Sequence, residues 1–157
     1  MSIDIEGQYD KLYRYCYFKL HNREMAEDIT QEAFLRYFER YNRLTEISAL
    51  KCLYTIVRNL CIDEYRKPQT QPIDSFISDD SMEERLITNL TVREALSKLT
   101  HREQELLLLR YANDVPVTVI GKIYGISRFA VYRQLTAAAN KFREELGKED
   151  SHGSLER

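Results

Sequence analysis

The sequence contains no tryptophan, five glycines and three prolines in 157 residues, but eleven tyrosines. The scarcity of turn-forming residues disfavours a fold of many short strands and favours helices packed through aromatic side chains. No run approaches the roughly 18 consecutive apolar residues of a membrane-spanning helix. The start, MSIDIEGQYD, lacks the basic and apolar regions of a secretion signal. We therefore expect a cytoplasmic protein that does not itself enter a membrane.

Cysteine and histidine are also sparse. Cys16, Cys52 and Cys61 stand far apart inside apolar patterns, without a Cys-x-x-Cys pair, so we expect them to pack in the core. The three histidines are equally scattered, and the sequence has no glycine-rich phosphate loop. We therefore predict no bound metal, no cofactor and no catalytic site, which argues against an enzyme.

The charge balance bears on which partners the chain can bind. Lys and Arg total 23 and Asp and Glu total 25, which gives a net charge of −2. Contacts from basic side chains to phosphates supply most of the nonspecific affinity of a DNA-binding protein. A chain of this charge that reads DNA is therefore expected to need a partner.

Apolar residues in the first 67 positions follow the 3.6-residue period of amphipathic helices. One stripe covers 9–20, and a second helix follows the capping residue Asn22 and ends near Tyr41. A third pattern covers 50–66. We expect these three helices to form a first small domain, residues 1–67.

Periodicity is lost over 68–80, where PQTQPIDSFISDD carries two prolines and several acidic residues. We interpret this stretch as an extended linker, which at about 3.3 Å per residue spans roughly 40 Å. Helical signals resume with capping boxes of the S/T-x-x-E type at Ser81 and Thr100. The second domain is expected over 81–146, followed by a disordered tail, 147–157. The predicted fold class is all-α, with two small helical domains joined by the linker.

The end of the second domain has the pattern of a helix-turn-helix. Pro116 begins a short apolar helix, Gly125 suits a tight turn, and a last helix runs from Ser127 to about Leu146. The early residues of that last helix are polar or aromatic, as in a helix that reads the major groove. A plain helical hairpin is the alternative.

Two further helix surfaces admit two interpretations each. Asp28, Glu32 and Leu35 share one face of the second helix with Gln31, while Ile29, Ala33 and Tyr37 are expected to point into the core. The third helix ends in basic and amide side chains suited to phosphates and base edges. Each surface is either an ordinary solvated face or a site for a partner.

Three stretches, taken together and in this order, resemble one protein family. AEDITQEAFLRYFERY resembles the helix by which bacterial sigma factors of the sigma-70 type grip the β′ subunit of RNA polymerase. LYTIVRNLCIDEYRK is similar to their helix that melts promoters and reads the −10 element. REALSKLTHREQELLLLRYANDVPVTVIGKIYGIS is similar to their domain that reads the −35 element. With only two domains and a short linker, the chain is similar to the extracytoplasmic-function group.

The resemblance implies three sets of site residues. The polymerase-binding set is Asp28, Gln31, Glu32, Phe34 and Leu35; the −10 set is Arg58, Asn59, Asp63, Arg66 and Lys67; the −35 set is Ser127, Arg128, Phe129, Tyr132, Arg133 and Thr136. The implied partners are the β′ and β subunits of core RNA polymerase, promoter DNA and an anti-sigma factor. The implied function is promoter recognition and transcription initiation, without catalysis.

The sequence also departs from the family's pattern. Ala137 and Ala139 stand where relatives carry basic residues, so some phosphate contacts are expected to be missing. Gly121 replaces a usual alanine, which we expect to cost about 1 kcal/mol if the position is exposed. Cys52 stands in place of a usual tryptophan.

One rival interpretation is an autonomous helix-turn-helix regulator that binds an operator without docking on polymerase. The net charge of −2 argues against it. The sequence also lacks an evident dimerisation helix, whereas such regulators usually bind paired half-sites.

Overall fold

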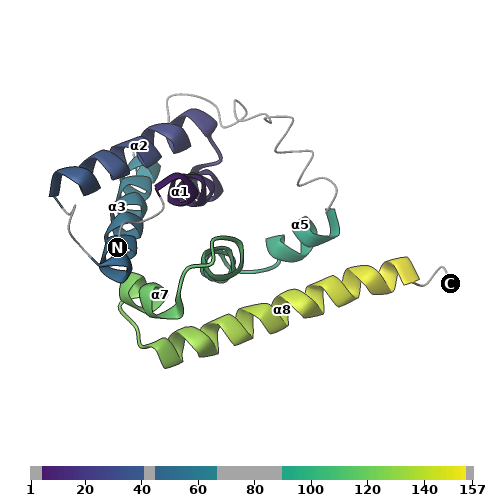
Figure 1. Ribbon diagram of the computed structural model, residues 1–157. Coiled ribbons are helices and arrows are strands. Elements are labelled where there is room, and N and C mark those ends of the chain that lie inside the picture. The colour runs from purple at the N-terminus through teal and green to yellow at the C-terminus, as the bar shows by residue number, and fades with distance from the viewer. Residues whose placement is uncertain (1–4, 41–44, 67–89, 155–157) are drawn as a thin grey trace.

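The computed structural model describes residues 5–40, 45–66 and 90–154, and the elements in these ranges are all helices (Figure 1). The N-terminal helices are α1 (Ile5–Leu20), α2 (Arg23–Arg40) and α3 (Glu46–Arg66). The C-terminal helices are α5 (Leu90–Ser97), α6 (His101–Leu107), the π-helical turn η2 (Leu108–Ala112), α7 (Val117–Tyr124) and α8 (Arg128–Ser154). The predicted all-α fold is confirmed. The predicted linker, 68–80, and the boundary at Ser81 lie outside the described residues.

The N-terminal helices pack on one another through the stripes that the sequence predicts, with α1 and α3 both against α2. The inward residues predicted on α2, which are Ile29, Ala33 and Tyr37, are all buried. Cys16 and Cys61 are buried as predicted, whereas Cys52 is half-buried. The periodicity of these helices therefore identified their core faces correctly.

Two local signals in the C-terminal helices are also confirmed. The Thr100 hydroxyl accepts a hydrogen bond from the Glu103 amide at 3.1 Å, and the Glu103 carboxylate accepts one from the Thr100 amide at 2.8 Å. These reciprocal bonds are the capping box that starts α6. Gly125 has a φ of +69°, which lets the chain turn sharply between α7 and α8.

The predicted end of the last helix near Leu146, with a disordered tail after it, is wrong. Helix α8 continues to Ser154. No proline follows Leu146, and Lys148 is a good helix former that pairs with Glu145 at 3.3 Å. Gly147 weakens the helix there but does not end it.

The cost expected for Gly121 was conditional on exposure, and the structure does not meet that condition. Gly121 is buried in α7, and a Cβ atom added there would lie 2.7 Å from the Ile126 carbonyl oxygen. That oxygen belongs to the turn of the helix-turn-helix. Glycine therefore allows a close approach of α7 to the turn, rather than merely loosening the helix.

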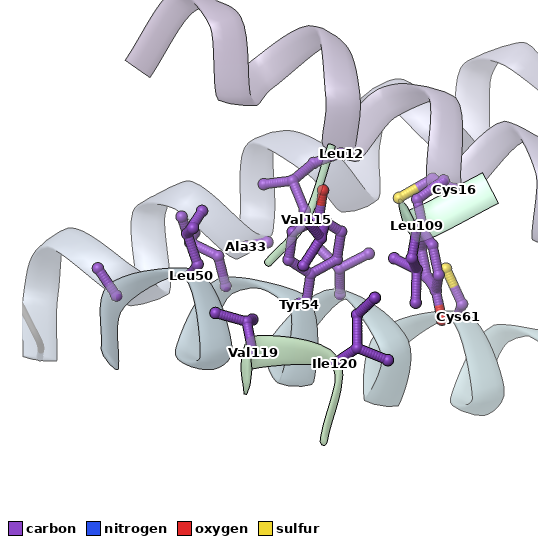
Figure 2. Close-up of a cluster of buried hydrophobic side chains, with 14 of the residues drawn as sticks. Leu12, Cys16, Ala33, Leu50, Tyr54, Cys61, Leu109, Val115, Val119 and Ile120 are labelled. Carbon is purple, nitrogen blue, oxygen red and sulfur yellow. The ribbon is translucent and has the colours of Figure 1, made fainter. Parts of the chain in front are cut away.

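The N-terminal and C-terminal helices share one core instead of standing apart. Helix α7 packs on α3, and η2 touches α1. Leu109, Val119 and Ile120 lie in the same buried cluster as Leu12 and Tyr54 (Figure 2). The sequence did not predict this contact, because the expected linker only allowed the domains to separate and said nothing about their packing.

Candidate polymerase and nucleic-acid interfaces

Helix α2 presents an exposed face that combines acidic and apolar groups. Asp28 and Gln31 are exposed, and the Glu32 carboxylate accepts a hydrogen bond from Arg36 at 2.9 Å. Leu35 is 58% exposed, and Phe38, which the sequence did not single out, is 43% exposed. A polar rim around two exposed apolar side chains is typical of a protein-binding surface.

Phe34, the fifth residue expected on this surface, lies in the core. It is buried, its ring stacks on Tyr9 with the ring centres 5.9 Å apart, and it also contacts Phe38 at 6.2 Å. Phe34 therefore supports the exposed Phe38 from below.

The C-terminal end of α3 carries most of the residues that the resemblance implied for the −10 element. Asn59, Asp63 and Arg66 are exposed, and Lys67 lies outside the described residues. The sequence reasoning missed Tyr65, which is 69% exposed beside Arg66. An exposed aromatic ring next to a cation is suited to stacking on an unpaired base.

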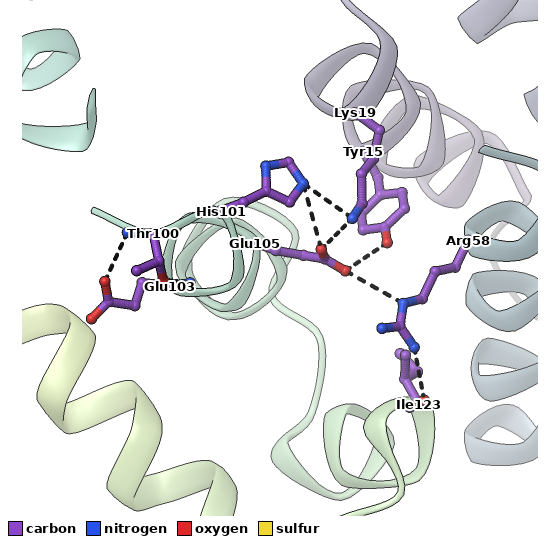
Figure 3. Close-up of polar contacts among 8 residues, drawn as sticks. All are labelled: Tyr15, Lys19, Arg58, Thr100, His101, Glu103, Glu105 and Ile123. Carbon is purple, nitrogen blue, oxygen red and sulfur yellow. Dashed lines mark hydrogen bonds and ion pairs between the residues drawn. The ribbon is translucent and has the colours of Figure 1, made fainter. Parts of the chain in front are cut away.

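Arg58 differs from its neighbours because the C-terminal helices hold it (Figure 3). Its Nη1 atom donates a hydrogen bond to the Ile123 carbonyl oxygen at 3.5 Å. Its Nε atom lies 3.8 Å from the Glu105 carboxylate, and its guanidinium carbon lies 4.7 Å from the centre of the Tyr124 ring. The side chain is only 31% exposed. Arg58, which the resemblance implied in binding the −10 strand, therefore contacts the C-terminal helices of the protein itself.

Glu105 is the centre of this arrangement. It is 3% exposed, accepts a hydrogen bond from the Tyr15 hydroxyl at 2.7 Å, and forms an ion pair with Lys19. The His101 Nε2 atom lies 4.0 Å from the same carboxylate. We name these residues, Tyr15, Lys19, Arg58, His101 and Glu105, the Glu105 cluster.

The Glu105 cluster joins the two groups of helices electrostatically. Burial raises the pKa of Glu105, but the hydrogen bonds from Lys19 and Tyr15 outweigh burial and hold this pKa below its ordinary value. Glu105 is therefore a buried carboxylate anion at neutral pH. Tyr15, Lys19 and Arg58 belong to the N-terminal helices, whereas Glu105 belongs to the C-terminal helices. Most partners of Glu105 therefore lie across the contact between these two groups of helices, which we name the seam.

Asn113 forms a second polar bridge across the same seam. Its side-chain amide donates to the Lys11 carbonyl oxygen at 2.8 Å and to the Tyr54 hydroxyl at 3.2 Å. Its side-chain oxygen accepts from Arg14 at 2.9 Å. Asn113 is 1% exposed, and these partners satisfy its buried polar atoms.

The first turns of α8 present the side chains expected of a reading helix. Arg128, Phe129, Tyr132, Arg133 and Thr136 are all exposed. Ser127 caps the helix, since its hydroxyl accepts a hydrogen bond from the Ala130 amide at 3.1 Å. Val131, Leu135 and Ala138 are buried, and Ala130 is half-buried.

Two negative findings apply to the described ranges. Within them, no group of three or more His, Cys, Asp or Glu side chains is placed to hold a metal ion. No helix of the described chain is long and apolar enough to cross a membrane.

Comparison with known proteins identifies the family of the chain. Residues 5–70 match the model of Sigma-70 region 2, and residues 95–144 match the model of Sigma-70, region 4. The chain is 26% identical over 156 residues to the ECF RNA polymerase sigma factor SigW of Bacillus subtilis, across 87% of this chain and 83% of SigW. It is 28% identical over 148 residues to the ECF RNA polymerase sigma factor BldN of Streptomyces coelicolor, across 83% of this chain but only 55% of BldN. It is 22% identical over 152 residues to the RNA polymerase sigma factor YlaC of Bacillus subtilis, across 89% of this chain and 88% of YlaC.

Both family models and all three relatives define the class as an RNA polymerase sigma factor, a non-catalytic factor that directs promoter recognition. Within that class, this chain belongs to the extracytoplasmic-function group of the sigma-70 family.

Proposed function

We propose that three separate surfaces divide the work of transcription initiation. The acidic and apolar face of α2 docks on the β′ subunit of core RNA polymerase. The exposed end of α3 holds the opened −10 strand, and the first turns of α8 read the −35 duplex. The observation that carries this proposal is that twelve of the fifteen described residues implied for the three surfaces are exposed, while Phe34 is buried and Glu32 and Arg58 are half-buried.

The α2 surface has the composition of a docking site. Leu35 and Phe38 supply apolar area that is lost to water when a partner covers it. Asp28 and Glu32 supply charge for basic residues of the partner. Phe34 takes part indirectly, because it packs under Phe38.

The α3 surface supports binding to a single strand. Arg66 offers a guanidinium to phosphates, Asn59 offers both a donor and an acceptor to a base edge, and Tyr65 offers a ring for stacking. We propose that Asp63 and Lys67 also belong to this surface. Arg58 joins it only when the C-terminal helices release it.

The α8 surface supports reading of a duplex. Arg128 and Arg133 suit guanine edges or phosphates, and Phe129 offers an apolar contact for a thymine methyl group. Ser127, Tyr132 and Thr136 complete the surface. Each good base contact is worth about 1–3 kcal/mol of discrimination.

The remaining parts of the proposal concern organisation and partners. The N-terminal domain is residues 1–67, the linker is 68–80, and the C-terminal domain begins at residue 81. The β subunit contacts the chain as well as β′, and an anti-sigma factor inhibits it by covering the α2 face. The protein acts in the cytoplasm, where promoters and polymerase meet.

The test is binding to purified core RNA polymerase, measured by native gel shift, followed by transcription on a promoter library. Asp28→Arg is expected to abolish the shift, because it places a cation where the partner is basic. Asp10→Arg is the matched control, since Asp10 is an exposed acid on α1 outside the face. It is expected to bind as the wild type does. An unchanged shift with Asp28→Arg refutes the docking assignment.

Transcription separates the proposal from its rival. New start sites that require both the chain and core polymerase support a sigma factor. Tight operator binding by the chain alone at physiological salt, with no effect of polymerase, identifies an autonomous regulator instead.

A further inference from the structure

Two of the three cysteines meet in the core, although they belong to different helices. Cys16 is on α1 and Cys61 is on α3, and both lie in the buried cluster that Figure 2 shows. Their thiols form a hydrogen bond with each other. The Thr30 hydroxyl, on α2, donates a hydrogen bond to the Cys16 Sγ atom at 3.6 Å. All three N-terminal helices therefore meet at a pair of thiols that none of the proposed surfaces uses.

The third cysteine stands apart from this pair. Cys52 is also on α3 but nine residues before Cys61, which is about 13 Å along the helix axis at 1.5 Å per residue. A disulfide requires Cα atoms within about 7 Å of each other. Burial and the nearby Cys52 thiol raise the pKa of Tyr37, which indicates that Cys52 lies towards α2. Of the three cysteines, Cys16 and Cys61 are therefore the two that are placed to react with each other.

The surroundings make the two thiols of the pair chemically unequal. The hydrogen bond from Cys61 lowers the pKa of Cys16, burial opposes this change, and the Thr30 hydroxyl lowers the pKa further. The hydrogen bond to Cys16 and burial both raise the pKa of Cys61. Cys16 is therefore the thiol that more readily becomes the nucleophilic thiolate, and Cys61 is the partner beside it.

We propose that Cys16 and Cys61 form a reversible disulfide when the chain meets a hydroperoxide, and that this bond fastens α1 to α3. The Cys16 thiolate attacks one oxygen of hydrogen peroxide, the O–O bond breaks, and the hydroxide that leaves takes up the thiol proton to become water. Cys61 then attacks the sulfur of the resulting sulfenic acid, the S–O bond breaks, and the hydroxyl group leaves with the Cys61 proton as a second water. Two thiols thus pass two electrons to one peroxide, and a dithiol reductant reverses the bond by exchange.

Burial determines which oxidant reaches the pair. Cys16 is 0% exposed and Cys61 is 2% exposed, so an oxidant reaches them only during local opening of the helices. A small hydroperoxide enters through such openings more easily than a bulky disulfide such as oxidised glutathione. The product closes a loop of about 45 residues around α2. The inference does not depend on the proposed function, although α3 also carries the proposed −10 surface.

The first test is oxidation of the full chain with hydrogen peroxide at neutral pH, followed by removal of the peroxide, denaturation and alkylation. Mass spectrometry is expected to find all three thiols alkylated in the reduced chain and only Cys52 alkylated in the oxidised chain. Peptide mapping should join the Cys16 and Cys61 peptides, and dithiothreitol should restore both thiols. A disulfide that involves Cys52, or oxidation of Cys16 to a sulfinic acid without any disulfide, overturns the proposal.

Two variants assign the roles of the thiols. Cys52→Ser is the matched control, because Cys52 stands apart from the pair, and it is expected to form the same bond as the wild type. Cys61→Ala removes the partner, so Cys16 is expected to stop at a sulfenic acid that dimedone traps. Circular dichroism before oxidation establishes that each variant is folded. Failure of Cys52→Ser to form the bond, or trapping of Cys61 rather than Cys16 in the matching Cys16→Ala variant, overturns the assignment.

The Tm measures whether the bond fits the native fold. Closure of a loop of this length is expected to raise the Tm of the oxidised chain by roughly 10 °C above that of the reduced chain. Cys52→Ser should show the same rise on oxidation, and Cys61→Ala should show none. An unchanged or lower Tm in the oxidised wild type overturns the claim that the bond fastens α1 to α3. These experiments use no polymerase, so failure of the polymerase assay above refutes the proposed function without deciding this proposal.

Discussion

Replacement of Gly121 by alanine tests whether close packing or helix propensity determines how this position affects the stability of the helix-turn-helix. In an exposed helix interior the change stabilises by about 1 kcal/mol, because alanine loses less backbone entropy on folding. At position 121 the new Cβ lies 2.7 Å from the Ile126 carbonyl oxygen and 3.6 Å from Val131 Cγ2. The first distance is too short for two non-bonded atoms, so α7 or the turn must move.

The structure allows the magnitude to be worked out. Overpacking of a buried site typically costs about 1–3 kcal/mol. After subtraction of the propensity gain, Gly121→Ala is expected to lower the free energy of unfolding by up to about 2 kcal/mol. For a chain of this size each kcal/mol corresponds to about 2–4 °C in Tm. The Ile126 amide bonds to the Gly121 carbonyl oxygen at 2.9 Å, so the displaced turn also misplaces the start of α8.

The assay is urea unfolding followed by far-ultraviolet circular dichroism, which suits a helical chain without tryptophan. Gly147→Ala is the matched control, because Gly147 is also helical but an added Cβ meets nothing within 4 Å. It is expected to leave stability unchanged or raise it by up to about 1 kcal/mol. If Gly121→Ala is as stable as Gly147→Ala, the crowding argument is refuted.

Three other predictions concern the caps, the seam and pH. Thr100→Ala is expected to cost about 1 kcal/mol in urea unfolding because α6 loses its cap, whereas Thr100→Ser retains the cap; equal loss in both variants contradicts this. Asn113→Ala leaves the Lys11 carbonyl oxygen and the Tyr54 hydroxyl without their donor, at a cost of about 1–3 kcal/mol, and an unchanged unfolding midpoint contradicts the bridge. Burial, together with the Lys19 cation, lowers the pKa of His101 below its ordinary value of 6.5. Between the lowered pKa and pH 6.5, the unfolded chain therefore binds a proton at His101 that the folded chain does not. The contribution of neutral His101 to the free energy of unfolding is complete above pH 6.5 and is lost as the pH falls towards the lowered pKa. Unfolding measured at pH 7.5 and 5.5 should show this loss, and His101→Gln should reduce it.

Features that depend on a few neighbouring residues were predicted correctly from the sequence. The pair of Thr100 and Glu103 predicts the start of a helix, because both partners of the capping box lie within one turn. Gly125 predicts the turn, because few other residues adopt a positive φ such as its +69°. The exposed face of α2 follows from helical periodicity alone, and Asp28 and Leu35 lie where that periodicity puts them.

The seam could not be predicted from the sequence, because its contacts join residues that are far apart in the chain. Tyr15 and Glu105 are 90 positions apart, and the Asn113 amide reaches Lys11 across 102. No local period encodes such pairs. One signal was present: Glu105 lies four residues before the buried Leu109, a spacing that places both side chains on one helical face. A lone acid on an apolar helix face indicates a cation elsewhere, but it does not identify Arg58.

A carboxylate at position 105 makes the contact between the two groups of helices selective rather than tight. A buried ion pair adds little net stability, since the loss of hydration offsets most of the attraction between the charges. An apolar side chain in its place would hold the two groups of helices together more firmly and resist separation. Glu105 instead makes this contact specific, because the Lys19 and Arg58 cations and the Tyr15 hydroxyl surround its carboxylate. The overall charge of −2 lowers the affinity of the free chain for any phosphate backbone. Tight DNA binding is therefore expected to depend on a partner that supplies positive charge, since Arg58 is engaged by Glu105 and Ile123 within the protein.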